Sequence, residues 1–254
     1  MTARKHPAAT VIAALVTAGT TRATAPADVA VPFKVGEVLT YDVSWSTFVT
    51  AGTATLSVAG RRPLAGGGQA YDLVGEGAPT AMLDKLYHVY YKAQTFLYTQ
   101  TLQPSISTVY SDEKGRKKLQ TTKFVNGTIE YQPKADAEVE RKTVPKIALD
   151  ALSAVYVMRI VPLKAGQSLT MPLVDGGGLY NARWQASGPE PIKTALGTLQ
   201  AWRITPTVTD GTGKTISNRK MTIWMTSDGR RLPVRLEVAL GVGSFTLTLS
   251  KVSG

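Results

Sequence analysis

The chain has 254 residues, of which 43% are hydrophobic and 19% are charged, and its formal net charge is +11. This composition is ordinary for a globular protein, and the length is sufficient for a core that needs no covalent staples. The chain contains no cysteine, which excludes disulfide bonds, thiolate metal sites and lipid attachment through an N-terminal cysteine.

The N-terminal residues have the three-part layout of a secretory signal peptide. Arg4 and Lys5 form a basic start, residues 8–19 form a short apolar run, and small residues follow as cleavage sites. We therefore predict a signal peptide over residues 1–27 and a periplasmic mature protein; a flexible tail is the alternative. The apolar run is shorter than the ~20 residues of a spanning helix, and no later segment qualifies, so no transmembrane segment is expected in the mature chain.

Cleavage after the leader would leave a basic protein. Residues 1–27 hold three basic residues and no acidic one, so the net charge falls from +11 to +8. Nucleic acid is the usual partner of a basic protein, but export argues against it, and we expect no nucleic-acid binding. Cell-envelope lipid headgroups or anionic polysaccharide would be attracted by this charge, although solubility alone also explains it.

Two pairs of segments resemble each other across the chain. "VPFKVGEVLTYDV" begins at Val31 and "VPLKAGQSLTMPL" begins at Val161, 130 residues later. "TLQPSISTV" from Thr101 resembles "RRLPVRLEV" from Arg230 at a similar separation. Chance is the alternative, but we favour an internal duplication. It divides the mature chain into β-rich halves over residues 28–147 and 161–254 that form one structural unit.

Both halves consist of short segments rich in Thr, Val, Tyr, Ile and Trp, which favour strands. Asn126-Gly127 predicts a type I′ hairpin turn. Because no crossover helices separate the strands, the sheets should be antiparallel. The expected strands cover residues 38–45, 53–59, 70–76, 87–97, 105–111, 117–125, 128–132, 168–173, 180–186, 198–206, 217–226, 233–240 and 244–252.

One clear helix bridges the halves, within residues 148–160. "DALSAVYVMRIV" begins at Asp150, a plausible N-cap, and Pro162 ends the helical pattern. A second helical turn is expected over residues 80–86. We predict an all-β, mainly antiparallel fold: two curved meander sheets that form an open barrel or sandwich, with the bridging helix at an open end or in the concave face.

Catalytic and metal-binding patterns are not recognisable in the sequence. His88 is the single histidine outside the leader, so neither a serine–histidine–acid triad nor a histidine zinc site is indicated. "DGTGKTIS" from Asp210 lacks the upstream glycine and the following helix of a phosphate loop, and it predicts a hairpin. No spacing selects a pair of carboxylates. We therefore predict no catalytic residue, no metal and no cofactor.

Aromatic and basic side chains are weak candidates for ligand binding. Tyr90, Trp202 and Trp224 could line an apolar groove. Arg231 and Arg235 alternate with apolar residues on the strand "DGRRLPVRLEV" and could contact an acidic headgroup. The simpler interpretation places the aromatic rings in the core and the arginines on the solvated face of the strand.

The chain resembles an exported bacterial family, domain-of-unknown-function family 3108, over roughly residues 31–252. Six blocks carry the resemblance in order: "FKVGEVLTYDVSW", "AGTATLSV", "DALSAVYVMR", "LKAGQSLTMPLVDGGGLY", "IKTALGTLQAWRI" and "MTIWMTSDGRRLPVRLEV". The chain has Asp150-Ala151 where the family has Asp-Pro. The resemblance implies an extracytoplasmic β-rich protein and no activity. By looser analogy of fold, the predicted sheets are similar to periplasmic lipoprotein carriers.

Three functions are compatible with these features. The leading hypothesis is a non-catalytic periplasmic protein that binds an apolar or amphipathic envelope molecule, lipid-like or polysaccharide. The alternative is a structural or assembly factor of the envelope that acts through protein partners and exposes an apolar patch or an unpaired strand. The third, less favoured, is a carbohydrate hydrolase, which would need two facing carboxylates in a cleft.

Overall fold

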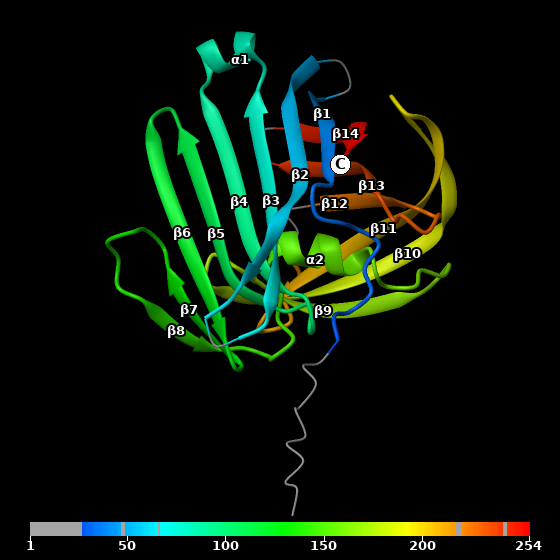
Figure 1. The fold of residues 1–254 in the computed structure, drawn as a ribbon. Helices are drawn as coiled ribbons and strands as arrows, with labels where there is room; N and C mark the ends of the chain where they lie inside the picture. Colours follow the sequence, from blue (N-terminus) through cyan, green and yellow to red (C-terminus); the bar gives the residue numbers. More distant parts are fainter. Residues whose placement is uncertain (1–26, 47–48, 66, 217–219, 241–242) are drawn as a thin grey trace, which may run out of the picture.

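The computed structural model describes residues 27–46, 49–65, 67–216, 220–240 and 243–254. Residues 1–26, and with them nearly all of the predicted signal peptide, lie outside the described residues. The strands form one antiparallel, 14-stranded sheet in the order β8-β7-β6-β5-β4-β3-β2-β1-β14-β13-β12-β11-β10-β9, which does not close (Figure 1). The predicted all-β, antiparallel, open fold is thus confirmed, and its two meanders are joined edge to edge.

The meanders differ in length. The first contains β1 (Val38–Trp45), β2 (Val49–Pro63), β3 (Gln69–Pro79), β4 (Val89–Tyr98), β5 (Pro104–Glu113), β6 (Arg116–Val125), β7 (Thr128–Gln132) and β8 (Glu140–Thr143). The second contains β9 (Ser168–Asp175), β10 (Gly178–Thr194), β11 (Gly197–Asp210), β12 (Lys220–Thr226), β13 (Pro233–Leu240) and β14 (Gly243–Ser253). Helix α1 (Ala81–Leu86) connects β3 to β4, and α2 (Ala151–Met158) connects the meanders. Among the described residues no helix is long and apolar enough to cross a bilayer.

The first and last strands hold the two meanders together. β1 pairs with β14 from Val38↔Ser253 to Trp45↔Phe245, and its other side pairs with β2. Every residue of β1 therefore lies between two partners. The first and last strands of the chain, β1 and β14, therefore lie side by side in the middle of the sheet.

Helix α2 lies inside the curve of the sheet (Figure 1) and begins where the sequence predicts it. Asp150 is the N-cap: its side chain accepts hydrogen bonds from the backbone of Leu152 and Ser153, while Ser153 Oγ accepts one from the backbone of Asp150, a capping box. Thr95 Oγ1 on β4 also donates to Asp150, at 2.9 Å. Burial nevertheless raises the pKa of Asp150 above its usual value, because these hydrogen bonds only partly offset desolvation.

Side chains of α2 fill the interior from both meanders. Ala154 and Met158 pack with buried residues of the second meander, such as Ile204. Leu152 and Tyr156 pack with buried residues of the first. The gap that remains beside Met158 has a volume of about 10 Å³, too small for an acyl chain. The core around α2 is therefore closely packed at this point.

The two outer edges of the sheet approach each other without forming a ladder. Leu149, just before α2, makes a single parallel bridge with Leu173 on β9. Lys142 Nζ on β8 donates to Gly177 O in the β9–β10 turn at 2.8 Å. Ile129, Val144, Ala148 and Val174 form a small buried cluster. These contacts bring the edge strands together while the sheet stays open.

The segments that resemble each other in sequence also share local backbone structure. Gly36 and Gly166 both have positive φ, +88° and +77°. Gly36 N donates to Val58 O at 2.8 Å, and Gly166 N donates to Ala186 O at 2.9 Å. The turn that leads into β1 therefore matches the turn that leads into β9, including its hydrogen bond to the second strand of each meander.

A second pair of turns also corresponds. Leu102 and Arg231 have positive φ, 56° and 49°, and each lies two residues before the proline that opens β5 or β13. Pairing of β4 with β5 shifts register between Phe96 and Leu97, and pairing of β12 with β13 shifts between Trp224 and Met225. Strands β1–β6 thus correspond to β9–β14, with β7, β8 and α2 between them. These correspondences support the duplication that we propose.

Candidate binding site

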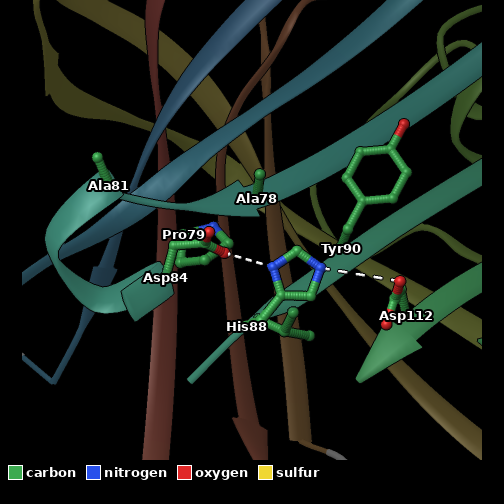
Figure 2. A pocket seen from close by; sticks show the side chains of 8 residues that line it. Ala78, Pro79, Ala81, Asp84, His88, Tyr90 and Asp112 are labelled. Atoms are coloured by element: carbon green, nitrogen blue, oxygen red, sulfur yellow. Dashed lines mark hydrogen bonds and ion pairs between the residues drawn. The ribbon is translucent and has the colours of Figure 1, made fainter. Parts of the chain in front are cut away.

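A pocket of about 480 Å³ lies beneath α1, where the connection from β3 to β4 meets the end of β5 (Figure 2). Its walls combine apolar and polar side chains, with more apolar than polar surface. The lining residues come from β3, α1, β4 and β5: Ala78, Pro79, Ala81, Asp84, His88, Val89, Tyr90 and Asp112.

Local hydrogen bonds fix α1 over this pocket. Thr80 caps the helix, because its side chain accepts from Leu83 N at 3.4 Å. Thr80 N donates to Ala51 O on β2 at 2.9 Å, which ties the start of the helix to the sheet. After α1 the chain enters β4, where Tyr90 pairs with Asp112 on β5. The strand register therefore places Asp112 directly across from Tyr90.

The polar wall is centred on His88, which lies between two carboxylates (Figure 2). His88 Nδ1 is 2.8 Å from Asp84 Oδ1 on α1, and His88 Nε2 is 3.9 Å from Asp112 Oδ2. Asp112 Oδ1 also accepts a hydrogen bond from Gly115 N at 3.0 Å, which holds the β5–β6 turn. Both acids are thereby oriented toward the imidazole.

Tyr90 forms the boundary between the polar and apolar walls. Its ring centroid lies 6.1 Å from that of Tyr110. Burial, followed by the negative charge of Glu76, raises the pKa of Tyr90. A hydrogen bond to the Glu76 side chain acts in the same direction, so the phenol remains protonated at neutral pH. Ala78, Pro79, Ala81 and Val89 supply the apolar surface beside it.

In this pocket the His88 side chain contacts the two carboxylates. In the part of the chain that the structure describes, no serine, threonine or tyrosine hydroxyl hydrogen-bonds to His88. Within those same residues, no cluster of three or more histidine and acidic side chains is arranged to hold a metal ion. The pocket instead offers hydrogen-bond acceptors on one side and a small apolar surface on the other.

Of the five residues that the sequence suggested as ligand contacts, Tyr90 lines this pocket. Trp202 is partly buried against the core cluster that contains Met158. Trp224 is only 6% exposed, and its Nε1 donates to Glu190 Oε1 at 2.5 Å. Both tryptophans therefore contribute packing in the second meander.

Arg235 lies near Trp224, and neither Arg231 nor Arg235 lines the pocket. The Arg235 guanidinium lies 5.5 Å from the centroid of the Trp224 ring and forms an ion pair with Glu237 at 2.7 Å. Arg231 occupies the turn before β13. The structure thus brings Arg235 and Trp224 together but does not join them to Tyr90, and a role of these arginines in headgroup binding stays a prediction.

Sequence reasoning did not select Asp84 and Asp112. Two signals could have found them. Asp84 precedes His88 by four residues across the predicted helical turn of residues 80–86, a spacing that brings side chains together. Asp112 faces Tyr90 if the strands over residues 87–97 and 105–111 form a hairpin, but the register was not determined by the sequence.

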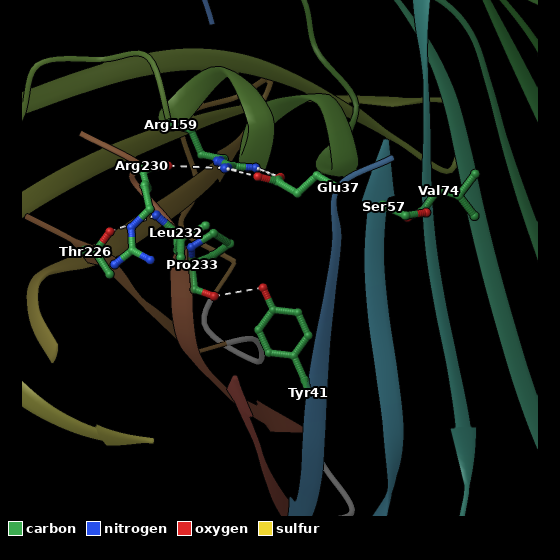
Figure 3. Close-up of polar contacts among 9 residues, drawn as sticks. All are labelled: Glu37, Tyr41, Ser57, Val74, Arg159, Thr226, Arg230, Leu232 and Pro233. Carbon is green, nitrogen blue, oxygen red and sulfur yellow. Dashed lines mark hydrogen bonds and ion pairs between the residues drawn. The ribbon is translucent and has the colours of Figure 1, made fainter. Parts of the chain in front are cut away.

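A second polar cluster is buried at the end of α2 (Figure 3). The Arg159 side chain is 1% exposed and binds Glu37 through both guanidinium nitrogens, with Nη2–Oε2 at 3.0 Å; Nη2 also donates to Arg230 O at 3.2 Å. The Tyr41 hydroxyl donates to Pro233 O at 2.8 Å. The cluster links α2 to β1 and to the β12–β13 turn, so its role is structural.

Comparison with known families identifies the family of the chain. A family model described as "Protein of unknown function (DUF3108)" matches residues 40–250. The chain belongs to this family. The resemblance stated from the sequence is therefore confirmed. No curated protein matches this DUF3108 chain in sequence.

Solved structures with a related architecture include the β-barrel-like protein of family DUF1849 from Brucella abortus. It is 9% identical, with a TM-score of 0.59 over 88% of this chain and 99% of that chain. A candidate lipoprotein from Parabacteroides distasonis is 10% identical, covering 89% of this chain and 100% of that chain, with a TM-score of 0.37. Lipoprotein LppX from Mycobacterium tuberculosis is 16% identical over 86% of each chain, with a TM-score of 0.26. The first likeness supports the fold alone, and the other two scores are too low to carry an argument.

Proposed function

We propose that this DUF3108 protein is a non-catalytic periplasmic protein that binds an amphipathic, lipid-like molecule of the cell envelope. The observation that carries the proposal is the pocket beneath α1, in which apolar surface from Ala78, Pro79 and Val89 meets the polar wall of Asp84, His88 and Asp112. Its volume of about 480 Å³ is within the range of ligand pockets, ~300–1,000 Å³.

The polar wall and the apolar wall of the pocket each indicate one chemical property of the ligand. Carboxylates accept hydrogen bonds and favour positive charge, so the polar group of the ligand should carry donors, such as an amine. The apolar part lies against the alanine, proline and valine side chains. Because the interior around α2 is packed, the ligand is held at the rim of the sheet. The predicted signal peptide supports the proposal, because it would direct the protein to the compartment where such lipids occur.

Native mass spectrometry of protein purified from an exporting host would show whether a lipid co-purifies. Calorimetric titration with lysophosphatidylethanolamine, which carries an amine, and with lysophosphatidylglycerol, which does not, then tests the pocket. Ala78→Trp fills the pocket and should weaken binding of the amine lipid by roughly ten-fold or more, a loss of about 1.4 kcal/mol.

The matched control is Ala135→Trp in the exposed β7–β8 connection, which should bind like the parent chain. Far-UV circular dichroism of both variants verifies folding. Equal binding by the two tryptophan variants, or no binding of either lipid by the parent protein, would remove the proposal.

A further inference from the structure

Helix α1 presents large apolar side chains to solvent. Met82 is 71% exposed, Leu86 is 77% exposed, and Tyr87, directly after the helix, is 47% exposed. No residue of α1 is buried. Met82 and Leu86 are four residues apart and share one face of the helix. Clustered exposed apolar residues of this kind mark interaction sites on soluble proteins more often than isolated ones do.

The neighbouring segment of residues 114–118, which joins β5 to β6 and includes the start of β6, is strongly basic, and we call it the β5–β6 turn. Lys114, Arg116, Lys117 and Lys118 are all exposed. The turn lies at the same end of the sheet as α1, because Val89 at the start of β4 pairs with Glu113 at the end of β5. In the described part of the chain, none of these four side chains forms an ion pair.

Direct contacts join the residues that follow α1 to the turn, including a hydrogen bond from Lys114 N to His88 O at 3.0 Å. Lys114 Nζ lies 4.3 Å from the centroid of the Tyr87 ring, a cation–π distance. The nearby acids have partners of their own: Asp84 and Asp112 face His88, and Glu113 accepts a hydrogen bond from Tyr91. The outer surface of α1 and the turn is therefore apolar at its centre and positive beside it.

We propose that α1, Tyr87 and the β5–β6 turn form a docking surface for a bilayer that contains anionic phospholipid. Stable attachment of a peripheral protein takes two signals, apolar insertion and a basic patch, and both are present on this surface. Leu86 and Met82 enter the headgroup region, tyrosine prefers the interface, and each lysine or arginine is attracted to the negative surface. The overall positive charge of the chain acts in the same direction.

This inference goes beyond ligand binding, because it concerns the outer surface of α1 and does not require an occupied pocket. Figure 1 shows α1 at the outer end of β3 and β4, where no other labelled element covers it. Docking there would bring the mouth of the pocket to the bilayer surface.

The test is flotation of the exported, purified protein with vesicles of phosphatidylethanolamine and phosphatidylglycerol in a 3:1 ratio, compared with phosphatidylcholine vesicles. The parent protein should bind the anionic vesicles and lose binding as salt is added. Met82→Ser/Leu86→Ser should weaken binding by about ten-fold or more. Lys117→Gln/Lys118→Gln should weaken it roughly thirty-fold, from the loss of two charges.

Matched controls lie at the opposite end of the sheet, near the β10–β11 turn: Leu196→Ser and Lys193→Gln, both exposed, should bind like the parent protein. Ala78→Trp should also keep vesicle binding, which separates docking from the pocket. No vesicle binding by the parent protein, equal binding of both vesicle types, or unchanged binding of both double variants would overturn the proposal. Capture of a protein partner that depends on Met82 and Leu86, without vesicle binding, would overturn it in favour of that partner.

Discussion

At the residue scale, the Glu37–Arg159 pair is a buried ion pair that joins the end of α2 to the start of β1. The Arg159 side chain is 1% exposed and that of Glu37 is 11% exposed. The guanidinium also lies 5.3 Å from the centroid of the Phe33 ring. A buried ion pair gains little over a well-packed apolar pair, but removal of one partner leaves a charge without compensation. The pair therefore fixes the position of α2 more than it adds stability.

Glu37→Gln should destabilise the protein by about 3 kcal/mol, because the Arg159 charge would remain buried without its counter-charge. Urea denaturation followed by tryptophan fluorescence measures the free energy of unfolding. The double variant Glu37→Leu/Arg159→Met removes both charges and should recover most of the loss. A single variant as stable as the parent, or a double variant no better than the single, would contradict this account.

The residues of the candidate site show which ligand contacts could be predicted from the sequence and which could not. Tyr90 was selected because aromatic residues crowd one segment, and it does line the pocket. His88 was set aside because it is a lone histidine. Its neighbour Asp84 is close in the sequence, but Asp112 comes from β5, which the sequence alone does not bring to His88. The partners of a side chain depend on strand register, and periodicity does not determine register.

At the element scale, the corresponding turns before β1 and β9 are the best test of the internal repeat. Gly36 and Gly166 both require positive φ, and nothing lies within 4 Å of a Cβ added at either position. Any cost of a larger residue at these positions therefore comes from the backbone and not from a clash.

Gly36→Ala and Gly166→Ala should each lower the free energy of unfolding by about 1 kcal/mol, and by similar amounts, because alanine is strained at positive φ. Gly60→Ala and Gly188→Ala are the controls, since both sites have open space and no positive φ; they should be neutral or slightly stabilising. Thermal denaturation measures all four. Strongly unequal effects of the first two variants would argue against equivalent turns.

Element boundaries were predictable where local signals exist. Asn126-Gly127 forms the predicted turn, with φ of 46° and 81°, and α2 begins after Asp150 as expected. Strand β10 is longer than the expected strand over residues 180–186, because it continues past Pro189 and Pro191. Pairing with β9 ends at Gln185. These prolines therefore lie where β10 has only one neighbour, and a missing N–H is tolerated at such an edge.

At the scale of the whole molecule, one continuous sheet and one shared helix join the two meanders. The β1–β14 pairing and the packing of α2 against both halves leave neither half with a complete core. The alternation of apolar residues predicted strands and their inward faces. The pairing of the first strand with the last has no local signal, so the continuity of the sheet could not be predicted.

The two meanders should therefore unfold together. Leu73→Ala removes a fully buried side chain of the first meander and should cost about 2–5 kcal/mol. Three of the four tryptophans, Trp184, Trp202 and Trp224, lie in the second meander, so their fluorescence should shift to the same lower urea midpoint as far-UV circular dichroism. Val109→Ala, at an exposed position, is the control. An unchanged fluorescence midpoint in Leu73→Ala would show that the halves unfold independently.

The pairing of β1 with β14 also determines when the sheet can be completed during biosynthesis. β1 is made early, yet one of its two hydrogen-bonding edges has no partner until residues 243–253 exist. Such a distant pairing closes slowly. The nascent polypeptide therefore carries an unfinished strand through most of its translation, and the native sheet is completed only after residues 243–253 have been made.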